Sequence, residues 1–173
     1  TEVRAADGEI EAFTSAESAG FGVRVIRGHR QGFAYAGTLD ADVVADTLGE
    51  ARDNAAGSTV DEFTGLVEPD GVAEVTLHLY DEALAGLGPD LKIELALELE
   101  RLVCAGDPRI LGVEMAEYAD SIETAVIAST TGIRSISRET GCSLAAYSLA
   151  GVDDDVTTGF GFSVGRGLDD LDL

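Results

Sequence analysis

Apolar and polar residues alternate along the start of the chain with the period of two that β-strands produce. Residues 2–15 alternate around Asp7-Gly8, a dipeptide typical of tight hairpin turns. A second hairpin is expected from residues 20–26 and 31–36, which flank Gly28-His29-Arg30. The first 36 residues therefore predict two consecutive β-hairpins.

The period changes after Asp40, which is placed to cap a helix. Gly57 is the kind of residue that follows a helix end. Between them, apolar residues recur at the three- and four-residue spacing of one helical face: Val44, Leu48, Ala51 and Ala55. We expect one helix over residues 41–56.

A second helix is predicted from Pro89 to Ala105, because proline suits a first helical turn and Pro108 forbids continuation. The short apolar stretch before it, residues 75–80, predicts a strand that contains His78. The expected buried stripe of the helix consists of leucines: Leu91, Leu95, Leu99 and Leu102.

The remainder of the chain predicts strands separated by turns at Asp120-Ser121, Thr131-Gly132 and Asp153-Asp154-Asp155. The expected strands are 110–118, 123–129, 133–150 and 156–164. The fold class is therefore α+β, with two small subdomains of antiparallel strands, each with a packed helix. They cover residues 1–57 and 75–173, joined by a polar linker loop over 58–74.

The chain carries a formal net charge of −22. Lys92 is the one lysine and no basic stripe exists, so nucleic-acid binding is not expected. The acidity indicates solubility, a basic partner or a salty cytoplasm. No apolar run approaches the ~18–20 residues of a membrane helix and no signal peptide is visible, so we expect a cytoplasmic protein with no membrane association.

Few residues qualify as metal ligands or nucleophiles. His29 falls in a hairpin turn, where we expect it to be solvated, and His78 is expected to be structural. Neither has a second histidine or cysteine at ligand spacing. Cys104 and Cys142 make no disulfide framework and are expected to be small buried apolar residues.

Three further motifs also favour structural roles. Gly159-Phe160-Gly161 lies in an alternating strand pattern and lacks the helix that a dinucleotide site requires. The run Asp153–Asp155 lacks the spacing of a calcium loop. Ser137-Arg138-Glu139 is interpreted as a strand face with paired charges, and no Gly-x-Ser-x-Gly elbow is present. We therefore assign no catalytic, cofactor-binding or metal-binding residue to this chain.

Several segments, taken in order, resemble the TldD/PmbA family of metal-dependent peptidases. Residues 20–34 resemble the family element G-x-G-V-R-V … G-R-x-G-F-A. Residues 128–132 resemble its N-S-x-G turn, and 138–144 resemble the strand that follows. The ending, residues 161–171, looks more like the PmbA branch, also called TldE, than the TldD branch.

The resemblance implies the amino-terminal region of a PmbA-like subunit, truncated before its carboxy-terminal domain. In relatives, the TldD-like subunit carries a His-Glu-x-x-x-His metal helix, so zinc is expected in a TldD-like partner and none in this chain. The resemblance also implies a hollow heterodimer that degrades or matures unfolded peptides, in which this region shapes the chamber and subunit contacts. The alternatives are self-association, or a free-standing peptide- or protein-binding module without catalysis.

Overall fold

The computed structural model describes residues 1–72 and 75–172. Their contacts form two compact units, each built of antiparallel strands and helices. Unit 1 contains residues 1–16, 74–126 and 136–173, and unit 2 contains residues 17–73 and 127–135. The predicted α+β class is confirmed.

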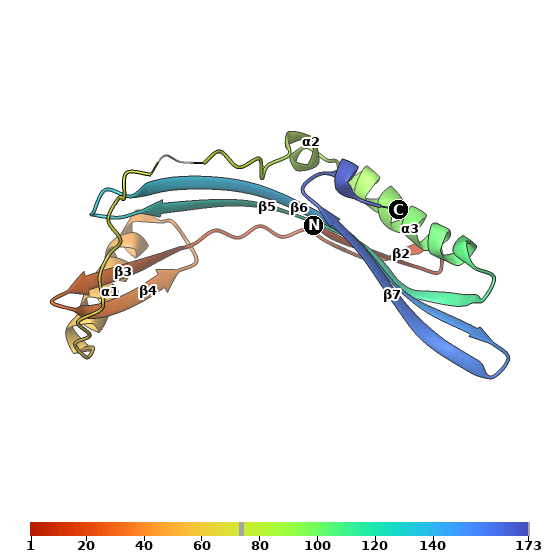
Figure 1. Cartoon of the computed structure of the whole chain (residues 1–173), viewed down its shortest axis with the longest axis horizontal. Helices are drawn as coiled ribbons and strands as arrows, with labels where there is room; N and C mark the ends of the chain where they lie inside the picture. The colour runs from red at the N-terminus through yellow and green to blue at the C-terminus, as the bar shows by residue number, and fades with distance from the viewer. Residues whose placement is uncertain (73–74, 173) are drawn as a thin grey trace. The chain divides into compact units, whose positions relative to one another are not determined.

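Unit 1 is organised around a five-stranded antiparallel sheet with the strand order β2-β1-β5-β6-β7 (Figure 1). Three long strands follow one another along the chain and form consecutive hairpins. Their bounds are β5 Ile110–Ala128, β6 Arg134–Val152 and β7 Asp155–Gly165. The turns predicted at residues 131–132 and 153–155 lie where β5 meets β6 and where β6 meets β7, although Asp155 already belongs to β7.

The first hairpin, β1 (Glu2–Ala6) and β2 (Glu9–Thr14), forms as predicted around Asp7 and Gly8, both with positive φ. β1 pairs with β5, so this hairpin belongs to the large sheet and not with the second hairpin. Hydrogen bonding of a strand to a partner more than a hundred residues away leaves no local sequence signal.

Helix α3 (Pro89–Gly106) packs on β1, and its predicted position is confirmed. Its buried face matches the predicted leucine stripe only in part: Leu99 is buried, but Leu91 is 41% exposed, and Ala96, outside the stripe, is fully buried. Ala96, Leu99 and Glu100 face the core. The core of unit 1 gathers residues of the sheet and both nearby helices: Val3, Ala5, Leu84, Ala96, Leu99, Val113, Ala116, Tyr118, Cys142, Leu144 and Ala146.

Two expectations for unit 1 are wrong. β5 runs without interruption through Asp120-Ser121, where a turn was predicted. The described part of segment 75–80 forms no strand, and the short helix α2 (Glu82–Ala85) follows it. A backbone hydrogen bond ties this segment to the sheet, from Thr140 N–H to the Leu79 carbonyl at 2.9 Å.

Unit 2 pairs the hairpin β3 (Phe21–Arg27) and β4 (Arg30–Ala36) with helix α1 (Ala41–Gly57). The helix backbone touches the hairpin at Gly32, where a Cβ atom would lie 2.1 Å from the Ala51 carbonyl oxygen. Hairpin and helix are thus predicted correctly, although Val44 of the expected helical face is 37% exposed.

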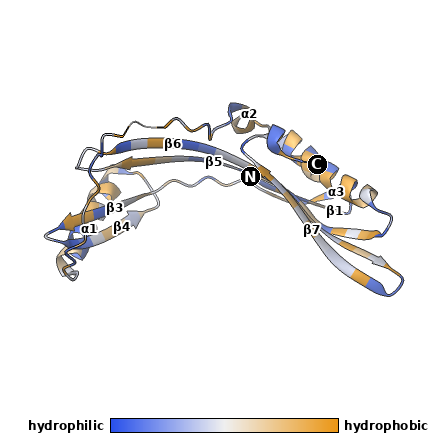
Figure 2. Cartoon of the chain, in the orientation of Figure 1, coloured by the Kyte–Doolittle hydropathy of each residue, from blue (hydrophilic) through white to orange (hydrophobic). Residues whose placement is uncertain are grey.

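The other face of this hairpin is uncovered within unit 2. Phe33 and Tyr35 stack there and are 54% and 78% exposed. Figure 2 shows the alternating hydrophobic and hydrophilic residues along the strands.

Candidate functional site

An open pocket of about 580 Å³ lies between neighbouring strands of the sheet in unit 1. Its lining comes from β5, β6 and β7 and from the segment after β7. The lining residues are Ala119, Asp120, Ser121, Gly141, Cys142, Ser143, Val164, Gly165, Arg166 and Asp170. Three chemically distinct groups, a carboxylate, a thiol and a guanidinium, therefore border one pocket.

Asp120 is the most strongly held acid of this pocket. Its side chain is 6% exposed and its Oδ2 lies 2.6 Å from Lys92 Nζ of α3. The Tyr118 hydroxyl donates a second hydrogen bond, at 2.9 Å. Burial alone would raise the pKa of the Asp120 carboxyl, but the hydrogen bonds from Lys92 and Tyr118 outweigh it and lower that pKa. Asp120 is thus an ionised, fully partnered carboxylate and not a poised base.

Neither Tyr118 nor Cys142 is activated for chemistry. Burial, followed by the hydrogen bond to Asp120, raises the pKa of Tyr118. Burial and then the nearby carboxylate of Asp170 raise the pKa of the Cys142 thiol. Because a thiolate is the reactive form of cysteine, a raised pKa in acidic surroundings makes Cys142 unreactive.

Thr140 joins three segments beside the pocket. It is 1% exposed, and its hydroxyl accepts from Asp81 N–H at 2.9 Å and donates to the Arg166 carbonyl at 2.7 Å. The Arg166 guanidinium in turn binds Glu139 at 3.0 Å. The Asp170 carboxylate accepts a further hydrogen bond from the Arg166 backbone N–H at 2.8 Å. These contacts fix the walls of the pocket.

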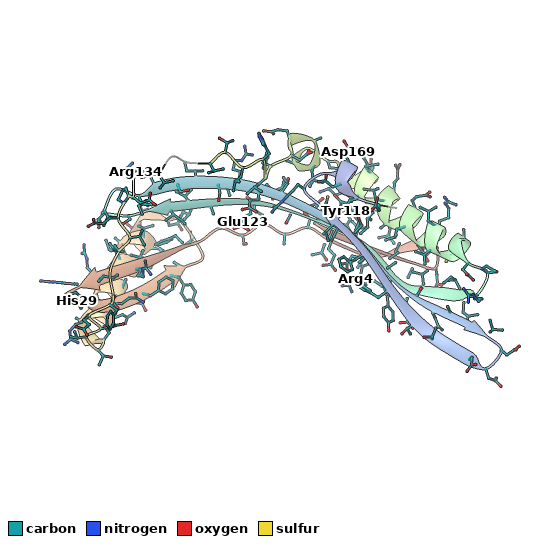
Figure 3. The ribbon with its side chains drawn as sticks, viewed as in Figure 1. Arg4, His29, Tyr118, Glu123, Arg134 and Asp169 are labelled. Carbon is teal, nitrogen blue, oxygen red and sulfur yellow. The ribbon has the colours of Figure 1, made fainter. Side chains whose placement is uncertain are left out.

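The histidines and Cys104 lie outside this pocket. His29 sits exposed in the turn of the β3–β4 hairpin, as predicted, with φ of 59° (Figure 3). His78 is also exposed, so its predicted structural place in a strand is wrong. Cys142 is buried as predicted, whereas Cys104 is exposed because the helix turns it away from the core.

The other motifs lie in strands and turns. Gly159 and Gly161 lie within β7, in agreement with the strand interpretation. Asp153 occupies the turn before it, with φ of 55°. Arg138 and Glu139 do not pair with each other: Arg138 stacks on Tyr80 at 3.9 Å from the ring centroid.

The donor set of the described residues does not fit a catalytic metal. Over residues 1–72 and 75–172, no three His, Cys, Asp or Glu side chains lie close enough together to hold an ion. The carboxylate of Asp120 is occupied by Lys92 and Tyr118. We therefore assign no metal-dependent step to these residues. In the same described part of the chain, no helix has the length and apolar character needed to cross a membrane.

The sequence does not identify as a group the pocket residue Asp120, its partner Lys92 and the neighbouring Thr140. Asp120 was interpreted as part of a turn because Asp and Ser favour turns. The available signal was the alternation of Tyr118 and Asp120, which places both side chains on one face of a strand.

Two family profiles match this chain in consecutive order. Residues 1–55 match the profile described as PmbA/TldA metallopeptidase domain 1. Residues 82–173 match the PmbA/TldA metallopeptidase central domain. The fold and the matches together define a domain pair of the metallopeptidase class. The chain belongs to the TldD/PmbA family and corresponds to its amino-terminal region, which confirms the resemblance seen in the sequence.

Individual relatives agree with this assignment. The chain is 25% identical over 164 residues to Metalloprotease PmbA of Escherichia coli O157:H7, covering 95% of this chain and 36% of that protein. It is also 25% identical over 165 residues to a Metalloprotease PmbA homolog of Haemophilus influenzae, covering 94% of this chain and 36% of the relative. The chain thus spans about a third of the length of these curated relatives.

The fold recurs in a solved structure, TldE from Thermococcus kodakarensis. The TM-score is 0.85 at 19% identity, over 97% of this chain and 38% of that one. At this identity the likeness establishes the fold.

Proposed function

We propose that this chain is the amino-terminal region of a PmbA/TldE-like subunit in a cytoplasmic metallopeptidase complex. In this proposal the region shapes the chamber and the subunit contacts, and a TldD-like partner supplies the zinc site. The substrates are unfolded peptides, which the complex degrades or matures. The ordered match of both family domains, over residues 1–55 and 82–173, is the observation that carries the proposal.

The local chemistry supports a non-catalytic role for this region. A peptidase needs either an activated water molecule, which requires an open metal site or a poised base, or an activated side-chain nucleophile such as a thiolate. Asp120 is engaged by Lys92 and Tyr118, and the pKa of Cys142 is raised. We infer that these groups stabilise the sheet while peptide hydrolysis takes place on the partner subunit.

The matched ranges also support a proposed division into family domains at residues 1–57 and 75–173, with a linker over 58–74. This division follows the order of the two domains along the chain. The compact units differ from it because the hairpin of β1 and β2 joins the sheet of the second domain.

Co-expression with a TldD-type subunit from the same source tests the proposed function. The protein that contains this chain should co-purify with that subunit, and the pair should cleave unstructured peptides. A chelator should abolish the cleavage, while the protein alone should be inactive. Equal hydrolysis by the purified protein alone would refute the division of roles.

A folded protein whose amino-acid composition is similar to that of the unstructured peptides serves as the substrate control. Because an enclosed chamber admits only extended chains, the pair should leave the folded control intact. If the protein bound peptides but never a TldD-type subunit, the alternative of a free-standing binding module would replace the proposal.

A further inference from the structure

β7 is an edge strand of unusual openness. It pairs with β6 on one side, and across residues 1–72 and 75–172 no strand pairs with its other side. Natural edge strands are usually short, bulged, or protected by lysine or proline. β7 has 11 residues without either residue type, and its register with β6 runs unbroken from Gly165 to Asp155. The opposite edge strand, β2, has 6 residues and a register shift against β1.

The register identifies the backbone groups at this edge. A two-residue turn, Asp153-Asp154, makes Val152 and Asp155 the closing hydrogen-bonded pair. Hydrogen-bonding direction alternates along a strand, so odd-numbered residues of β7 bond to β6. The even-numbered residues, such as Thr158 and Phe160, point their N–H and C=O groups away from the sheet.

An apolar row accompanies this edge. Phe160, Phe162 and Val164 lie on one face of β7 and are 60%, 69% and 63% exposed. The two phenylalanine rings lie 5.8 Å apart between centroids. The other face carries Gly159 and Gly161, which offer no side chain to pack against. An added strand would therefore gain apolar contacts on one face only. This favours an added strand in which apolar and polar residues alternate.

Acidic residues flank both ends of β7. Asp153, Asp154 and Asp155 stand at its start, about 33 Å along the strand from its end. Asp169, Asp170 and Asp172 follow its end. The nearby cation, Arg166, is already bound to Glu139. A second copy paired antiparallel along β7 would bring like charges together at both ends, whereas basic ends on the added strand would be attracted.

We propose that the free edge of β7 binds an extended peptide with basic ends and alternating apolar residues, which adds to the sheet as a sixth strand. Backbone hydrogen bonds supply affinity, the Phe160–Val164 row selects apolar side chains on one face, and the acidic ends select charge. This inference goes beyond the proposed function, because strand addition at β7 needs neither a metal nor a partner subunit.

Three synthetic peptides test the proposal on the 173-residue chain. The first alternates valine and threonine over eleven residues and has two lysines at each end. The second replaces the lysines with glutamates, and the third is the first with alternate backbone nitrogens methylated. The lysine peptide should bind about tenfold more tightly than the glutamate peptide. The methylated peptide should not bind, because it cannot donate to the edge.

Amide exchange followed by NMR locates the binding. The lysine peptide should slow exchange at Thr158, Phe160 and Phe162, and leave Gly159 and Gly161 unchanged because those amides already bond to β6. Phe160→Lys should weaken binding about tenfold through charge repulsion and lost contact. Its matched control, Tyr35→Lys, makes the same charge change at an exposed aromatic of unit 2 and should bind normally.

Three results would overturn the proposal. They are the absence of binding, equal affinity for the lysine and glutamate peptides, and protection of amides away from β7. Slow exchange of the outward amides in the peptide-free chain, together with a dimer mass, would show instead that a second copy occupies the edge.

Discussion

Thr140→Val is the sharpest test of how unit 1 is held together. Valine has nearly the shape of threonine, so packing at this site, 1% exposed, is retained while the hydroxyl is lost. The hydroxyl accepts from Asp81 N–H and donates to the Arg166 carbonyl. The bond from the Thr140 backbone N–H to Leu79 remains. The substitution thus removes two hydrogen bonds and leaves both partners in place.

The expected loss of unfolding free energy follows from the two backbone groups that lose their hydrogen bond to Thr140. A polar group left buried without its hydrogen bond costs about 1–3 kcal/mol. The Asp81 and Arg166 backbone groups are only partly buried, so we expect a total loss of about 2–4 kcal/mol in unfolding free energy. For a chain of this size, each kcal/mol lowers the melting temperature by about 2–4 °C.

Urea unfolding measures the loss, and amide exchange at Asp81 locates it. The matched control is Thr140→Ser, which keeps the hydroxyl and loses one methyl group, at a cost of about 1 kcal/mol. We expect Asp81 exchange to accelerate in the valine variant only. Equal stability of the valine variant and the wild type, with unchanged Asp81 exchange, would refute this account of the junction.

Three further predictions concern the helices and the pocket. Gly32→Ala should displace α1, because the new Cβ meets helix backbone, and should lower the free energy of unfolding by about 1–3 kcal/mol in urea melts, while Gly49→Ala in open space should not. Leu99→Ala should cost about 2–5 kcal/mol and Leu91→Ala under about 1 kcal/mol, and equal losses would show that the buried face of α3 is misassigned. The pKa of Asp120 is lowered on folding, so its contribution to stability is present above about pH 4 and is lost as the pH falls through the folded pKa. Urea midpoints at successive pH values should therefore fall less steeply on acidification in Asp120→Asn, and an unchanged slope would contradict this.

Local signals in the sequence are sufficient to predict several of the turns and the two long helices, α1 and α3. Asp7-Gly8, Thr131-Gly132 and Pro89 each determine backbone geometry within a few residues, and the structure places turns or a helix start at all three. Asp120 shows where such signals fail. Its polarity predicted a turn, but Lys92 and Tyr118 satisfy its carboxylate inside a continuous strand.

The buried face of α3 could not be derived from its own sequence. Apolar residues occur on more than one side of this helix, so periodicity alone allows several orientations. Glu100 makes the contact that decides which face of α3 is buried. Its carboxylate is buried and accepts hydrogen bonds from Gly8 N–H at 3.1 and 3.2 Å. A charged residue would ordinarily mark the solvent side. Only the hairpin turn of β1 and β2, far away in the sequence, reveals that Glu100 faces inward.

The charge balance of unit 1 also depends on contacts between residues that lie far apart in the sequence. The basic side chains of unit 1 are engaged within it: Arg4, Lys92, Arg101, Arg109 and Arg166 pair with acids, and Arg138 stacks on Tyr80. Among the described residues of unit 2, by contrast, five arginines make no ion pair: Arg24, Arg27, Arg30, Arg52 and Arg134. In the described part of unit 1, Arg138 is thus the one basic side chain that pairs with no acid, and a single charge leaves most of the acidic surplus of the unit without neutralisation. Any neutralising charge must come from solution or from a bound partner, which is why the charge of the peptide ends is the decisive variable at β7.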